Sequence, residues 1–123
     1  MEPLLIESTN RTPLISLSPS GKFKIHGRSI HENPVKFFEP VIDWMDNYVL
    51  KPEETTVFDI KLEYFNSSSQ RFILDVLRIL TDNLEGKKLI INWYYESGDD
   101  DLLERGQYYE SILNKKFNLI EFE

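Results

Sequence analysis

The chain has 123 residues, a formal net charge of −7 and no cysteine, and this length suffices for one domain, residues 1–123, with its own hydrophobic core. The lack of cysteine excludes disulfides and thiolate metal sites, and no segment has the character of a signal peptide or a membrane span, so we expect a cytoplasmic protein without membrane association. The acidic balance repels phosphate backbones and therefore disfavours nucleic-acid binding.

The first third of the chain is predicted to form a hairpin followed by a helix. Residues 14–17 and 23–26 alternate apolar and polar positions on either side of a Ser-Pro-Ser-Gly turn, which is typical of a hairpin. Asn33 and Pro34 fit the N-cap and the first position of a helix whose apolar residues recur at helical spacing. Pro40 lies inside this pattern, so we expect it to kink the helix or to split off its first turn.

The rest of the chain alternates strands and helices. Residues 55–65 predict a strand, residues 67–84 the clearest helix, and residues 88–95 a second strand. A third helix is predicted over residues 97–116 and a last short strand over residues 119–122. This alternation favours parallel strands joined by helical crossovers. We therefore predict an α/β fold with a four- to five-stranded, mostly parallel sheet and about three helices, in which strand 55–65 is central.

The segment Asn66-Ser67-Ser68-Ser69-Gln70 lies where a predicted strand passes into a helix. Ser67 and Gln70 have the spacing of a capping box, which would make Ser67 the N-cap. The same position suits a phosphate, because a helix N-terminus offers free N–H groups and the positive end of the helix dipole. We predict Ser67 as the phosphorylated switch residue, with Ser68, which should point outward from the first turn, as the alternative. The capping and switching roles are compatible.

The other candidate sites are better explained by structural roles than by catalysis or metal binding. Residues 99–101, three aspartates, fit an acidic first helical turn capped by Ser97 or Asp99 better than a Mg²⁺ or Ca²⁺ loop. His26 and His31 match no metal-ligand spacing, and the chain has neither a Gly-x-Ser-x-Gly elbow nor a glycine-rich phosphate loop. We therefore expect no enzyme activity, no metal and no cofactor. An active site built from His26, His31 and nearby carboxylates stays open as a rival hypothesis.

Four short motifs are spread over almost the whole chain. They are Thr12-Pro13, Gly-Arg-Ser-Ile-His-Glu-Asn at 27–33, Val-Ile-Asp-Trp at 41–44, and Leu-Glu-Tyr-Phe-Asn-Ser-Ser-Ser at 62–69. In this order and spacing the chain resembles the SiaC family of bacterial regulatory phosphoproteins, small domains similar in fold to the STAS domains of anti-sigma-factor antagonists. The resemblance implies a single STAS-like domain.

The resemblance also implies partners and a role. Family members are phosphorylated by a partner kinase and dephosphorylated by a PP2C-type phosphatase, and the unphosphorylated form activates a diguanylate cyclase, which sets cyclic-di-GMP levels and biofilm formation. The family motif Asn-Thr-Ser-Ser places its phosphoacceptor on Ser67, whereas the more distant STAS pattern Asp-Ser-Ser-Gly would place it on Ser68. We therefore expect a phosphorylation-switched binding protein. The alternative is a sensor domain that binds a small anion or nucleotide at residues 67–69 without phosphorylation.

Overall fold

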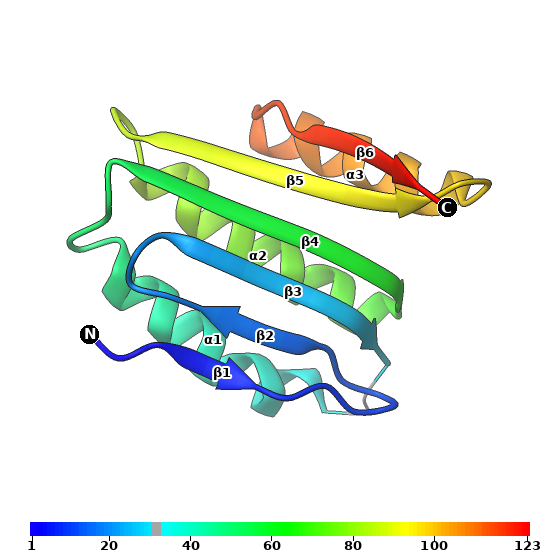
Figure 1. Cartoon of the computed structure of the whole chain (residues 1–123), viewed down its shortest axis with the longest axis horizontal. Coiled ribbons are helices and arrows are strands. Elements are labelled where there is room, and N and C mark those ends of the chain that lie inside the picture. The colour runs from blue at the N-terminus through cyan, green and yellow to red at the C-terminus, as the bar shows by residue number, and fades with distance from the viewer. Residues whose placement is uncertain (31–32) are drawn as a thin grey trace.

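The computed structural model describes residues 1–30 and 33–123, which form one sheet with helices packed on one of its faces (Figure 1). The helices are α1 (Pro34–Tyr48), α2 (Ser67–Asn83) and α3 (Asp100–Leu113). The strands lie across the sheet in chain order, and they are β1 (Leu4–Ile6), β2 (Leu14–Leu17), β3 (Lys22–Ser29), β4 (Thr55–Phe65), β5 (Lys88–Glu96) and β6 (Asn118–Phe122).

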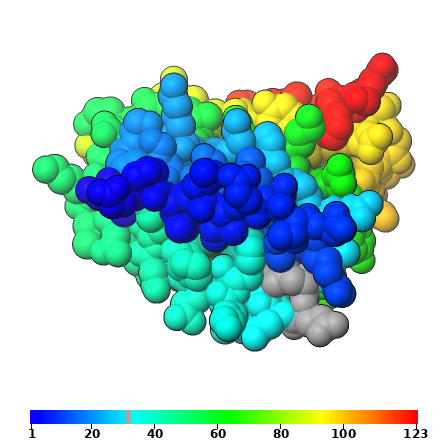
Figure 2. All heavy atoms as spheres, turned by 60° about the horizontal axis from the view of Figure 1, so that its bottom comes forward, coloured from blue at the N-terminus to red at the C-terminus, as the bar shows by residue number. Residues whose placement is uncertain are grey.

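The sheet is antiparallel in its first three strands and parallel from β3 to β6. The predicted α/β class, the N-terminal hairpin and the central position of β4 are confirmed. The sheet has six strands where the sequence predicted four to five, because the edge strand β1 was missed. β1 has only three residues, all apolar, so it shows no alternation. Figure 2 shows this N-terminal segment, in dark blue, crossing the middle of the visible face above the cyan atoms of α1.

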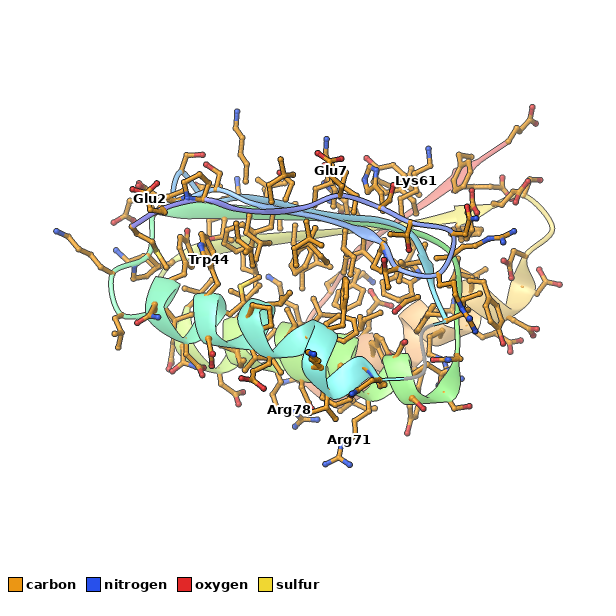
Figure 3. All side chains as sticks on the ribbon, turned by 90° about the horizontal axis from the view of Figure 1, so that it is seen from below. Glu2, Glu7, Trp44, Lys61, Arg71 and Arg78 are labelled. Carbon is orange, nitrogen blue, oxygen red and sulfur yellow. The ribbon has the colours of Figure 1, made fainter. Side chains whose placement is uncertain are left out.

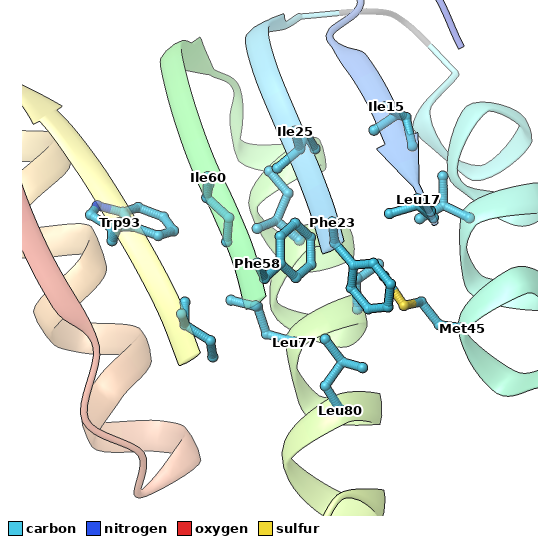
Figure 4. Packing of buried hydrophobic residues seen from close by; sticks show 14 of the residues in the cluster. Ile15, Leu17, Phe23, Ile25, Met45, Phe58, Ile60, Leu77, Leu80 and Trp93 are labelled. Atoms are coloured by element: carbon cyan, nitrogen blue, oxygen red, sulfur yellow. The ribbon is translucent and has the colours of Figure 1, made fainter. Parts of the chain in front are cut away.

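The hydrophobic core fills the space between the sheet and the helices (Figure 4). Phe23 of β3 packs against three other aromatic rings of this core, with ring centroids 5.3 Å from Trp44, 4.9 Å from Tyr48 and 5.8 Å from Phe58, all edge-on. Each such pair contributes about 0.5–1.5 kcal/mol beyond the area that it buries. This aromatic cluster fixes α1 against the centre of the sheet.

The opposite face of the sheet is free of helices, as Figure 3 shows, with Lys61 pointing away from the helical layer and Arg71 on the far side. A row of side chains crosses this face along the strand register. The Asn118 side-chain amide donates to Asn92 at 2.9 Å, and that of Asn92 donates to Asp59 at 2.8 Å. Polar side chains suit this face because no helix covers it.

Helix α1 begins as predicted, with Asn33 Oδ1 accepting from the Lys36 backbone N–H at 3.3 Å and Pro34 at the first helical position. It then runs through Pro40 as one element, so a split first turn is wrong, whereas a kink at Pro40 stays a prediction. An interior proline costs a helix one hydrogen bond, and the burial of the nearby Phe38 and Val41 offsets part of this cost. None of the helices in the described part of the chain is long and apolar enough to cross a membrane.

A β-bulge shapes the end of β4. Gly27 pairs with Leu62 but the next residue, Arg28, pairs with Tyr64, so Glu63 is an extra residue on β4. The bulge turns both Glu63 and Tyr64 to solvent and returns Phe65 to the core. The chain thus leaves the sheet with a bend directly before α2.

Candidate functional site: the junction of β4 and α2

Asn66 is the residue that joins β4 to α2. Its backbone is extended, and its Oδ1 accepts from the Ser69 backbone N–H at 3.0 Å, which makes Asn66 the N-cap. The Gln70 backbone N–H donates to the Asn66 carbonyl at 3.0 Å. The predicted cap at Ser67 is therefore wrong by one residue, and Ser67 is the first residue of the helix. Asparagine and serine cap equally well, so the residue type does not decide between them.

The three serines of the junction have different surroundings. Ser67 and Ser68 are exposed, whereas Ser69 is fully buried. The Ser29 hydroxyl donates to the Ser69 hydroxyl at 2.8 Å, and the Ser29 carbonyl accepts from the Asn66 N–H at 3.0 Å. A kinase must reach the hydroxyl that it modifies, so the accessible hydroxyls of the run are those of Ser67 and Ser68.

Ser67 differs from Ser68 in lining a pocket of about 340 Å³ between the end of β4 and the first turns of α2 and α3. The charged residues of this Ser67 pocket are Glu63, Asp99, Asp101, Glu104 and Arg105. Four carboxylates and one guanidinium thus line the pocket, and the carboxylate of Glu63 also pairs with Arg28 at 3.2 Å. The hydroxyl of Ser67 lies at the edge of an acidic surface, to which a phosphate would add negative charge.

The acidic turn predicted at residues 99–101 forms one wall of this pocket. Asp99 is the N-cap of α3, and its Oδ1 accepts from the Leu102 N–H at 3.0 Å. This confirms the interpretation as a capped acidic turn, with Asp99 and not Ser97 as the cap. The helix is shorter than predicted, because Gly98 before it and Asn114 after it have left-handed backbone, with φ of 88° and 51°.

Helix α3 is held to the site by Trp93 and Tyr109. The Trp93 indole N–H donates to the Leu102 carbonyl at 3.0 Å, and Gly106 lies directly against the Trp93 ring. The Tyr109 hydroxyl donates to the Gln70 carbonyl at 2.7 Å, in the first turn of α2. Burial raises the pKa of Tyr109, so its proton is retained for this bond. The first turn of α2 is therefore tied to the second half of α3.

His26 of the rival active site lies on the open face of the sheet. Burial, followed by the charges of Lys24 and Lys61, lowers the pKa of His26, so the imidazole is neutral at pH 7. It lines a hollow that shares only Glu63 with the Ser67 pocket. His31 lies outside the described residues. The structure therefore does not bring His26 to the switch segment, and no metal-binding cluster occurs among the residues it describes.

Removing the cap is expected to destabilise the protein more than removing the neighbouring hydroxyl. Asn66→Ala should lower the free energy of unfolding by about 1 kcal/mol, since the Ser69 N–H loses its acceptor. Ser67→Ala should change it by less than about 0.5 kcal/mol, because the side chain is exposed. Urea denaturation of the two variants measures both values. A larger loss of unfolding free energy for Ser67→Ala than for Asn66→Ala would indicate that Ser67 caps α2.

The buried pair of Ser29 and Ser69 is expected to behave as one unit. Either single alanine variant leaves one buried hydroxyl without its partner, at a cost of about 1–3 kcal/mol. The double variant removes both hydroxyls, so it should cost less than the sum of the single variants. A double-mutant cycle by urea denaturation measures this coupling, and additive values would show that the two hydroxyls act independently.

The sequence matches a known family over nearly its whole length. A family model described as SiaC family regulatory phosphoprotein matches residues 6–122. The chain is also 28% identical over 106 residues to an uncharacterized protein of Pseudomonas aeruginosa strain UCBPP-PA14, covering 85% of this chain and 84% of that relative.

Solved structures give the same family. The chain superposes on apo-SiaC from Pseudomonas aeruginosa with a TM-score of 0.88 and 25% identity, over 98% of this chain and 99% of that one. It also superposes, with a TM-score of 0.88 and 25% identity, on a chain of the crystal structure of the diguanylate cyclase SiaD in complex with its activator SiaC from Pseudomonas aeruginosa, over 97% of this chain and 99% of that one. The resemblance read from the four sequence motifs is confirmed.

Proposed function

The chain belongs to the SiaC family of regulatory phosphoproteins, and from this premise we propose that it binds and activates a diguanylate cyclase until a phosphate on Ser67 releases it. The observation that carries the site is that Ser67 is exposed, begins α2 and lines the acidic pocket at the end of β4. The class of partner rests on the similarity to the SiaC that activates SiaD.

Two features favour Ser67 over Ser68 as the acceptor. Ser67 follows the cap Asn66 directly, as the phosphoacceptor follows asparagine in the family motif. A phosphate at the first helical position lies next to backbone N–H groups without intrahelical partners and to the positive end of the helix dipole. The modification is therefore tolerated by α2 itself, and its effect falls on whatever faces Ser67 across the pocket.

The switch we propose works through charge and bulk. A phosphate brings about −1.5 to −2 charges at neutral pH to a pocket that already holds four carboxylates. A partner surface that accepts the free hydroxyl is then repelled or obstructed. A partner kinase would add the phosphate and a PP2C-type phosphatase would remove it, both in the cytoplasm.

Phosphosite mapping by tandem mass spectrometry on the protein from its host tests the acceptor. A phosphate on Ser67 is expected. A phosphate on Ser68 alone would keep the class of function and move the acceptor by one residue. Unmodified peptides throughout, with full coverage of residues 62–78 under several growth conditions, would overturn the proposal in favour of the small-anion or nucleotide sensor, which a thermal shift with phosphate or nucleotide would then detect.

The partner is tested with a purified diguanylate cyclase from the same host. The unphosphorylated chain is expected to raise the rate of cyclic-di-GMP synthesis, and the chain carrying phosphoserine at position 67 is expected not to. Phosphoserine at position 68 is the matched control for added charge. Equal activation by all three forms would separate binding from phosphorylation and contradict the switch.

A further inference from the structure

Helix α3 is the least embedded of the three helices. It buries three residues, compared with six in α1 and five in α2. It starts after Gly98, whose backbone is left-handed and whose missing side chain would meet open space. An element with few buried side chains and a permissive turn at its start moves at lower cost than its neighbours.

The first two turns of α3 carry most of the charge that faces Ser67. Asp99, Asp101 and Glu104 line the Ser67 pocket from α3, with Arg105 as the cation among its lining residues. A phosphate on Ser67 is attracted by the N-terminus of α2, which carries it. On α3 the three carboxylates repel it, against the attraction of Arg105 and of the positive end of that helix, about +0.5 charge, so the balance of charge on α3 is repulsive. The attraction therefore stabilises α2 in its position, whereas the repulsion acts to displace α3.

We propose that a phosphate on Ser67 displaces the first two turns of α3 from the end of β4, so that phosphorylation also changes the exposed surface of α3. The inference rests on the proposed function in taking Ser67 as the acceptor. The bond from Trp93 to the Leu102 carbonyl lies in the part that moves, and the bond from Tyr109 to Gln70 lies beyond it and serves as the pivot.

The displacement changes a surface that a partner can contact. Tyr108 is 55% exposed on α3, and the Arg105 guanidinium lies 5.8 Å from the centre of its ring. A shift of the first two turns moves Arg105 relative to Tyr108. The exposed side of α3 at Arg105 and Tyr108 thus forms part of the switched surface, together with the first turn of α2.

Hydrogen exchange on site-specifically phosphorylated protein tests this without a kinase or a partner. Phosphoserine is placed by genetic code expansion at position 67, or at position 68 as a control with the same charge outside the pocket. Peptides covering residues 102–109 are expected to exchange faster with phosphoserine 67 than with phosphoserine 68 or unmodified protein. The difference should shrink as salt is added, because the repulsion is screened. Peptides from β3 and β4 report that the fold is intact.

Replacing two carboxylates of the Ser67 pocket by amides distinguishes electrostatic repulsion of the phosphate from a general loosening of α3. In the Asp101→Asn, Glu104→Gln double variant, phosphoserine 67 is expected to accelerate exchange in α3 less than in the parent chain. Equal exchange in the two phosphorylated proteins, or slower exchange with phosphoserine 67, would overturn the inference, the latter because attraction to Arg105 would then dominate. Either result leaves the acceptor untouched, since phosphosite mapping decides that question alone.

Discussion

Ser67→Ala is expected to reduce phosphate incorporation to background and to keep the protein permanently in its cyclase-activating form. The variant removes the proposed acceptor, and the cap at Asn66 and the buried pair of Ser29 and Ser69 stay intact. Stability should therefore change little, so a loss of phosphorylation cannot be attributed to unfolding. Intact-mass spectrometry of protein from the host measures incorporation, and cyclic-di-GMP synthesis by a purified cyclase measures activation.

Two further variants control this experiment. Ser68→Ala removes the other exposed hydroxyl and is expected to be phosphorylated like the parent chain. Ser67→Thr keeps a hydroxyl and supplies the residue type of the family motif, so it should restore phosphorylation. Phosphate incorporation in Ser67→Ala that disappears in Ser68→Ala would transfer the role of acceptor to Ser68.

The fold could be predicted from the sequence because its elements carry strong periodic signals. Strand β4 alternates inward Phe58, Ile60 and Leu62 with outward residues, and α2 repeats apolar residues at helical spacing. The position of the cap could not be predicted to the residue. Asn66 and Ser67 are both good caps, and the bulge at Glu63 advances the chain by one residue, which decides that Asn66 stands at the bend.

Of the candidate site, the sequence predicts Ser67 but not the wall of the pocket opposite it. Ser67 stands out locally because a hydroxyl run at a helix start is visible in the sequence. The opposite wall of its pocket comes from α3, more than 30 residues later, and depends on contacts such as Tyr109 with Gln70 and Gly106 with Trp93. Such pairings between distant helices and strands follow from packing, which local patterns do not encode.

Gly106→Val is expected to destabilise the protein strongly, although position 106 lies on a helix. A Cβ at position 106 would lie 2.7 Å from the Trp93 ring, well inside contact distance. The ring cannot turn aside freely, because its N–H is bonded to the Leu102 carbonyl and Tyr109 and Phe117 pack against it. Such overpacking costs about 1–3 kcal/mol, and the displaced α3 takes the acidic wall of the Ser67 pocket with it.

Gln107→Val is the matched control, because it adds the same side chain to the exposed side of the same helix. Helix propensity alone favours valine over glycine at position 106, so a packing-free helix would be slightly stabilised there. Urea denaturation should instead show a large loss for Gly106→Val and a small one for Gln107→Val. Near-equal values would mean that α3 moves away from Trp93 at little cost.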